Sequence, residues 1–265
     1  AVHADEQYFD GPHTPDAGFY SAAYRSHNHH FLTLAAVMAG ASAVAIESSR
    51  AVVEIVTPDI ARVAPPVEPM LAVPVQTLLT FGRWADVLRT PMPPSDLRIA
   101  SAHFWYARGV AFAATERMSE ARATLDSIKS VRGTLSEGEP RITLQIAEHM
   151  LSGDMALRQG DAVAAAQAFT DAATLEDQLS YMEPPTWHHP VRQALGKALL
   201  AAGKFREAEQ AYRADLHRFP ENGWSLRGLA QALTAQGRLS EAREVEQRFA
   251  KAWRMADVVL PTSRF

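Results

Sequence analysis

Two stretches in the C-terminal part of the chain repeat one pattern at a spacing of 34 residues. Residues 201–209 read AAGKFREAE and residues 235–243 read AQGRLSEAR. Gly203 and Gly237 can adopt the left-handed backbone conformation that ends a helix. The alanine that follows each turn is small enough for the next helix to pack closely against the first. A repeat of this length predicts stacked helix hairpins, because one hairpin cannot bury its apolar face alone.

The period, the glycine at the turn and the alanine after it resemble the tetratricopeptide repeat. This resemblance implies an all-α, right-handed solenoid of helix hairpins. Weaker copies lie upstream at spacings of 34 to 44 residues, which allows loop insertions of about ten residues. The predicted turn residues are Gly40, Gly82, Glu116, Gly160, Gly203 and Gly237. The sequence therefore predicts about six hairpins.

Proline-rich stretches separate several of the predicted hairpins, because proline does not continue a helix. They lie at residues 65–69, 91–94 and 184–185. Residues 1–20 have the composition of a loop and are predicted to be an entry segment or linker, followed by a single solenoid over residues 21–265. The last helix is expected over residues 240–255, and the tail VVLPTSRF is expected to cover the end of the stack.

The composition is that of a soluble globular protein, with 47% hydrophobic and 21% charged residues. The net charge of -4 leaves no basic footprint for nucleic acid, and no apolar run is long enough to span a membrane. The absence of cysteine excludes disulfides, thiolate ligands and a thiol nucleophile. The chain opens AVHADEQYFD, without Met or a signal region, so we expect a processed product or part of a longer chain. The compartment stays open, with the cytoplasm favoured.

Histidines are concentrated on the first helices of the predicted hairpins. In a tetratricopeptide stack these helices line the concave face, and their second and fifth positions point into the groove. His27 and His30 occupy both positions of the first hairpin. The predicted groove residues are His27, His30, His103, Tyr106, Trp187, His188, Arg192, Trp224 and Arg227. Imidazole, aromatic and guanidinium groups suit a polar or anionic ligand.

The same histidines allow a metal site to be predicted. His27 and His30 are spaced i,i+3 on a helix, so that both can face one point. With His103 or His188 they would bind a divalent transition metal, the one cofactor that the sequence suggests. Glu183 or His188 would then act as a general acid or base. We favour the alternative that these histidines line the groove or pack, since neither H-E-x-x-H nor a Ser–His–Asp order is present.

Further motifs resemble a bacterial group of large, poorly characterised tetratricopeptide-repeat proteins. The most specific are Y-x-x-H-N-x-H-F-L from Tyr24 and Y-x-E-P-P-x-W-x-x-P-V-R from Tyr181, with Phe81–Trp84 and Ala107–Gly109 between them. The resemblance covers nearly the whole chain. Members of the group look longer at the N-terminus, which implies that this chain is a C-terminal part. The resemblance implies the fold and the site but no activity.

Three functions are open at this point. The favoured one is a scaffold that binds a protein or peptide partner in its groove, without enzymatic activity. The second is a metal-dependent enzyme or a metal-binding protein. The third is a structural, self-assembling subunit, a homo-oligomer whose groove is filled by its own N-terminal segment or by a second copy.

Overall fold

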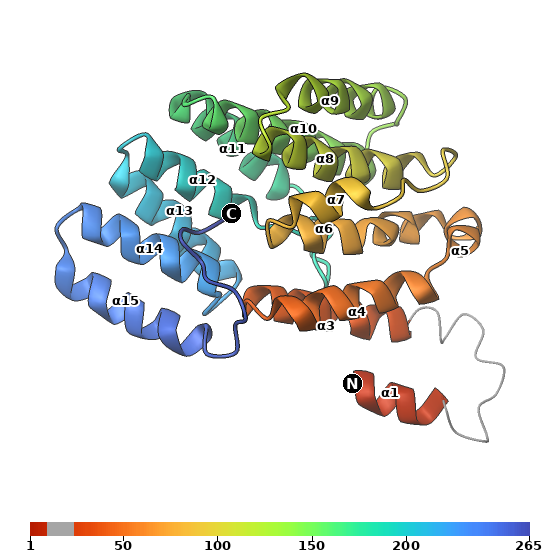
Figure 1. The fold of residues 1–265 in the computed structure, drawn as a ribbon, viewed down its shortest axis with the longest axis horizontal. Coiled ribbons are helices and arrows are strands. Elements are labelled where there is room, and N and C mark those ends of the chain that lie inside the picture. The colour runs from red at the N-terminus through yellow and green to blue at the C-terminus, as the bar shows by residue number, and fades with distance from the viewer. Residues whose placement is uncertain (10–23) are drawn as a thin grey trace.

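Six helix hairpins follow one another along the chain in the computed structural model, which describes residues 1–9 and 24–265. The pairs are α3 (Ser26–Met38) with α4 (Ser42–Ile55), α6 (Val73–Thr80) with α7 (Trp84–Arg89), α8 (Arg98–Ala114) with α9 (Met118–Arg132), α10 (Glu139–Arg158) with α11 (Ala162–Glu176), α12 (Val191–Ala201) with α13 (Phe205–Arg218), and α14 (Gly223–Ala235) with α15 (Leu239–Ala252). Successive pairs lie side by side (Figure 1). No strand occurs in the described residues. The predicted all-α solenoid of about six helix hairpins is confirmed.

Each hairpin turns at the residue that the repeat pattern picks out. The backbone φ at these six positions is 72° at Gly40, 66° at Gly82, 63° at Glu116, 84° at Gly160, 72° at Gly203 and 75° at Gly237. Glu116 shows that a side chain can be accommodated in this turn, at a cost of about 1 kcal/mol. The left-handed residue is thus the common device that reverses the chain.

The helices of a hairpin approach closely because small residues face large ones. A Cβ at Gly196 of α12 would lie 2.4 Å from the ring of Tyr212 on α13. Tyr212 is fully buried in this contact. The alanines after the turns are buried in the same way, as Ala208 shows. The repeat pattern therefore encodes the distance between helices as well as their boundaries.

Two further elements lie outside the hairpin pattern. α5 (Pro58–Val63) and the 3-10 helix η2 (Pro65–Ala72) connect the first hairpin to the second. α1 (Val2–Phe9) is a helix at the start of the predicted entry segment, and its Asp5 accepts a hydrogen bond from Asn28 of α3. Residues 10–20 of that segment lie outside the described part of the chain. The division into residues 1–20 and 21–265 stays a prediction.

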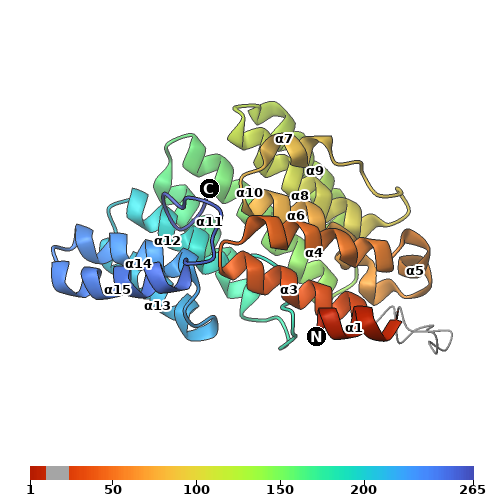
Figure 2. The ribbon, with the colours of Figure 1, turned by 60° about the horizontal axis from the view of Figure 1, so that its bottom comes forward.

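The first and last hairpins contact each other directly. Trp224 of α14 donates from Nε1 to the carbonyl oxygen of Val37 on α3, at 2.7 Å. Trp253 packs against Gly40, where a Cβ would lie 2.4 Å from its ring. The α3–α4 hairpin accordingly reaches the α14–α15 end of the stack in Figure 1 and in Figure 2. The stack is closed by these contacts rather than left open at both ends.

Residues 257–265, which we call the C-terminal segment, return across the inner face, the side formed by the first helices of the hairpins (Figure 1). Asp257 accepts hydrogen bonds from the backbone of Ser42 and Ala43 at the start of α4. Arg264 pairs with Asp154 of α10 at 3.0 Å. This corrects the expectation that the tail covers the end of the stack. The end hairpins already cover each other, so the segment runs inward. No helix among residues 1–9 and 24–265 meets the length and apolarity that a membrane span requires.

Candidate functional site

Four of the predicted histidines converge on one pocket of about 200 Å³, which we call the imidazole pocket. His27 and His30 come from α3, His103 from α8, and His188 from the connecting loop, residues 177–190, between α11 and α12. The other lining residues are Pro66, Pro69, Met70, Val73, Gln76, Met182, Glu183, Pro184, Pro185 and Thr186. The pocket therefore joins the first three hairpins to a loop that follows the fourth.

Ring contacts order the buried histidines. The His30 and His188 rings are stacked, with centroids 5.7 Å apart and planes inclined by 16°. His188 meets His189 edge-on at 5.1 Å. His103 lies 3.1 Å from Gln76, measured between Nδ1 and Nε2. His27 is exposed at the rim, where its ring contacts Phe31.

Burial keeps the imidazoles of His30, His103 and His188 neutral. It lowers the pKa of His30 and of His103 to about 4, and the pKa of His188 to about 3. Desolvation is the main cause, because a buried imidazolium loses its hydration. At neutral pH each ring therefore offers one N–H donor and one lone-pair acceptor.

His188 is the exceptional member of the pocket. It is only 5% exposed, yet neither of its ring nitrogens has a hydrogen-bond partner within the described chain. His30 Nε2 is unpartnered in the same way. Buried polar atoms are normally paired, since leaving one unpaired costs about 1–3 kcal/mol. These nitrogens are inaccessible to solvent, so a ligand in the pocket reaches them after neighbouring side chains shift, and each nitrogen then gains a hydrogen bond.

The remaining predicted groove residues lie outside this pocket. Tyr106 and Trp224 are fully buried, and Trp187 packs between His103 and Tyr106. Arg192 pairs with Glu176 at 3.4 Å and with Asp177 at 2.6 Å. Arg227 pairs with Glu246 of α15 at 3.0 Å. Each of these side chains contacts other residues of the protein itself, and Trp224 does so where the stack closes.

The two candidate catalytic residues differ in environment. Glu183 is exposed at the pocket rim and accepts a hydrogen bond from the Tyr181 hydroxyl. His188 is a weak base because its pKa lies far below neutral, whereas a general base works best near the operating pH. Burial raises the pKa of the Glu176 carboxyl group to about 7, which is close to neutral pH. Glu176 instead accepts a hydrogen bond from the N–H of Val191, at the start of α12.

The metal prediction meets a geometric obstacle. No group of three or more His, Cys, Asp or Glu side chains that could hold a metal ion occurs in residues 1–9 and 24–265. Ring nitrogens bind metal along lone pairs in the ring plane, at about 2.0–2.1 Å for zinc. The rings of His30 and His188 are stacked, so their lone pairs lie in nearly parallel planes and do not point toward one common metal ion. These residues do not form a metal centre in this arrangement.

The apolar wall of the imidazole pocket was not predicted. Pro66, Pro69 and Met70 of η2 supply much of it, although the proline run in the sequence indicated only a connector. The apolar residues beside these prolines, in the stretch PPVEPMLA, could have indicated a buried wall, because a connector exposed to solvent does not need apolar side chains. Gln76 was also missed, because an isolated glutamine carries no pattern.

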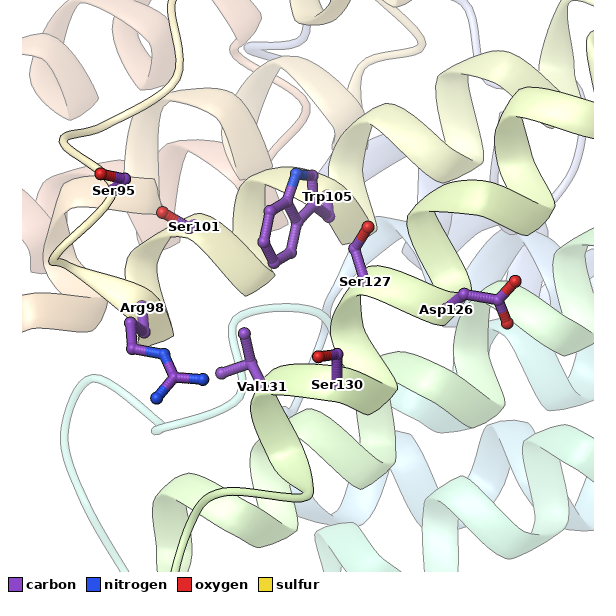
Figure 3. Close-up of a pocket in the computed structure, with 8 residues that line it drawn as sticks. All are labelled: Ser95, Arg98, Ser101, Trp105, Asp126, Ser127, Ser130 and Val131. Carbon is purple, nitrogen blue, oxygen red and sulfur yellow. The ribbon is translucent and has the colours of Figure 1, made fainter.

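A second pocket, of about 400 Å³, lies between α8 and α9 (Figure 3). Arg98 and Trp105 on α8 face Ser127 and Val131 on α9 across it. None of the predicted site residues lines this pocket. The imidazole pocket is therefore the stronger candidate.

Comparison with known families supports the repeat. Residues 194–255 match the tetratricopeptide repeat family, and they cover most of α12 and all of α13, α14 and α15. These C-terminal hairpins are similar to tetratricopeptide repeats. The match falls where the 34-residue period is clearest. No curated protein matches the chain. Membership of the bacterial group stays a prediction.

Proposed function

We propose that this tetratricopeptide-repeat protein is a scaffold that binds a partner protein through the imidazole pocket. Stacked repeats provide preformed helical surfaces, and such surfaces bind other proteins without large rearrangement. The observation that carries the proposal is His188, buried on the pocket wall with both ring nitrogens unpartnered.

The size of the pocket favours one side chain of a partner over a free small molecule. Small-molecule sites generally enclose about 300–1,000 Å³, whereas this pocket has about 200 Å³. Its walls include four prolines, two from η2 and two from the connecting loop. Flat apolar walls and neutral imidazoles together suit a side chain with an apolar ring and a polar tip. Tyrosine has this chemistry.

The rim of the pocket offers additional contact area. Met182 lines the pocket and is 55% exposed, and its neighbour Tyr181, which hydrogen-bonds to Glu183 of the rim, is 83% exposed; both side chains have substantial apolar surface. His27 lies at the same rim. An anchor residue surrounded by weaker contacts is the common arrangement of protein interfaces. We therefore place the backbone of the partner peptide along α3 and the connecting loop.

The test is selection of peptides from a random display library on the purified protein, followed by fluorescence anisotropy of the enriched sequences. We expect enriched peptides to share a tyrosine, and His188→Leu to weaken their binding at least about tenfold. His149→Leu is the matched control, because His149 lies on α10, half-exposed and outside the pocket. Enriched peptides that bind the His188→Leu protein as well as the unaltered one would refute the proposal.

The unpartnered nitrogens of His30 and His188 also keep the metal hypothesis open as a second candidate. Zinc binding there requires one ring to turn out of the stack. Calorimetric titration with zinc, repeated on His30→Ala, decides between the two. Binding that disappears in the variant would replace the peptide function by a metal-dependent one, with His27, His103 and Glu183 as the next ligands to test. The self-assembly hypothesis predicts a mass in solution that rises with concentration, which sedimentation measures.

A further inference from the structure

The C-terminal segment is bound to the inner face through contacts with many separate elements. Leu260 is buried in one apolar cluster with Val37, Phe81 and Trp224. Gln231 of α14 donates to the carbonyl oxygen of Pro261 at 2.8 Å. The segment contains no helix, and its internal hydrogen bonds join Thr262 to Arg264, so its position depends largely on its contacts with the helices.

Ser263 occupies a fully buried position of the segment. Its hydroxyl lies 2.7 Å from the Tyr212 hydroxyl and donates to the carbonyl oxygen of Gln193 at 3.1 Å. Hydrogen bonds on two sides hold this residue in place. A hydroxyl-bearing side chain is therefore selected at this position.

Arg264 inserts its guanidinium among side chains of α8 and α10. It pairs with the Asp154 carboxylate at 3.0 Å, and both side chains are largely buried, with 17% and 10% exposed. It also reaches the Tyr106 hydroxyl at 3.5 Å. Removing one member of a buried ion pair leaves an uncompensated charge. Asp154 therefore selects a cation at this point of the inner face.

Backbone and aromatic contacts complete the site. Lys197 of α12 donates from Nζ to the carbonyl oxygens of Arg264 and Phe265, at 3.1 and 3.3 Å. The Phe265 ring meets Trp224 edge-on, with centroids 5.9 Å apart. Lys197 recognises the backbone whatever the sequence, whereas the other contacts select a hydroxyl residue, an arginine and an aromatic residue in that order.

We infer that the C-terminal segment is an internal ligand, and that the surface beneath it binds an extended segment of a partner protein with the pattern hydroxyl residue, arginine, aromatic residue. The two segments compete for one surface, so the internal copy sets the affinity that the partner must exceed. This surface shares none of its contact residues with the imidazole pocket. The inference therefore stands or falls independently of the proposed function.

The probe is a fluorescein-labelled peptide with the sequence of residues 257–265, measured by anisotropy. Arg264→Asp places a carboxylate against Asp154 and weakens the internal copy. We expect this variant to bind the peptide at least about tenfold more tightly than the unaltered protein, because its surface is open more of the time. The exposed Arg254 supplies the control variant Arg254→Asp, which should behave as the unaltered protein. A peptide that carries Asp in place of Arg264 should bind neither.

A covalent lock provides the second test, because the chain has no cysteine of its own. A Cβ at Gly82 lies 3.1 Å from Cβ of Phe265, close to the ~3.5–4.5 Å that a disulfide spans. The Gly82→Cys/Phe265→Cys protein should bind the peptide when reduced and lose that binding when oxidised. This comparison decides the question even if Arg264→Asp does not fold. Equal binding in the two redox states, or no binding to a folded Arg264→Asp protein, would overturn the inference.

Discussion

Two buried polar groups, Asp215 and His188, have opposite surroundings. Asp215 is 2% exposed and accepts hydrogen bonds from Ser225 at 2.5 Å, Asn222 at 3.2 Å and Gln193 at 3.3 Å. His188 is almost as buried but has no hydrogen-bond partner in the described chain. A satisfied buried group stabilises the fold, whereas an unsatisfied one weakens it. The difference separates a structural cluster from a candidate binding site.

The local chain explains why the two differ. Asp215 belongs to α13, and a short connection brings Asn222 and Ser225 of the next hairpin to it. His188 belongs to the connecting loop, residues 177–190, which is long and brings His188 to His30 of the distant helix α3. Short connections within the repeat place partners by sequence spacing. A long insertion does not place hydrogen-bond partners in this way.

The largest effect is expected from Asp215→Ala, which removes the acceptor of Ser225 and one of the two acceptors of the buried Asn222 and Gln193 amides. We expect the free energy of unfolding to fall by about 3–5 kcal/mol, measured by urea denaturation. Asp171→Ala is the control, since Asp171 is half-exposed on α11. A loss below about 1 kcal/mol would show that the satisfied cluster is not structural in this sense.

Acidification should act through the imidazole pocket. The folded pKa values of His30, His103 and His188 lie below the ordinary value of 6.5. Between about pH 4 and 6.5 the unfolded chain therefore binds more protons, and stability falls as the pH is lowered. Glu176 opposes this, because its raised pKa of about 7 makes stability fall as pH rises from 4.5 to 7. The histidines outnumber it, so we expect a net loss on the order of 3 kcal/mol between pH 7 and pH 5.

Thermal melts at the two pH values measure this loss. In the His103→Gln/His188→Leu protein the loss should nearly disappear, because the remaining His30 and Glu176 then act in opposite directions by similar amounts. Stability that stays constant between pH 7 and pH 5 would contradict neutral, buried imidazoles.

Asn222→Ala tests the structural cluster at its edge. Asn222 caps α14 by accepting from the N–H of Ser225 at 2.9 Å, and it also donates to Asp215. We expect a loss of about 2 kcal/mol, of which about 1 kcal/mol is the cap. Asp161→Ala removes an exposed cap of α11 that lacks a buried partner, so the difference between the two variants isolates the buried hydrogen bond. Equal losses would remove Asn222 from the cluster.

The smallest effect on stability is expected from His188→Leu. This change removes two unpartnered nitrogens from a buried position, so the free energy of unfolding should change by less than about 1 kcal/mol in either direction. The same denaturation curves measure it. A loss greater than about 2 kcal/mol would assign His188 a structural role and remove the contrast with Asp215.

The repeat pattern predicted the hairpins because turns and close helix contacts are local. Gly203 and Gly237 show the period, and even Glu116 was placed correctly at a turn by spacing alone. The pairing of His27 with His30 on one helix was predicted for the same reason. Their convergence with His103 and His188 required the position of the connecting loop, which no periodicity encodes.

The sequence by itself determined the helix hairpins, the residues at which they reverse and the small side chains that set their spacing. These depend on backbone conformation and on contacts between neighbouring helices. Only the tertiary structure decided that Trp224 closes the stack on Val37 and that Arg264 crosses the inner face to Asp154. These contacts join residues far apart in the chain, and small rotations between successive hairpins accumulate to bring them together. That accumulated curvature placed His188 in a pocket beside His30.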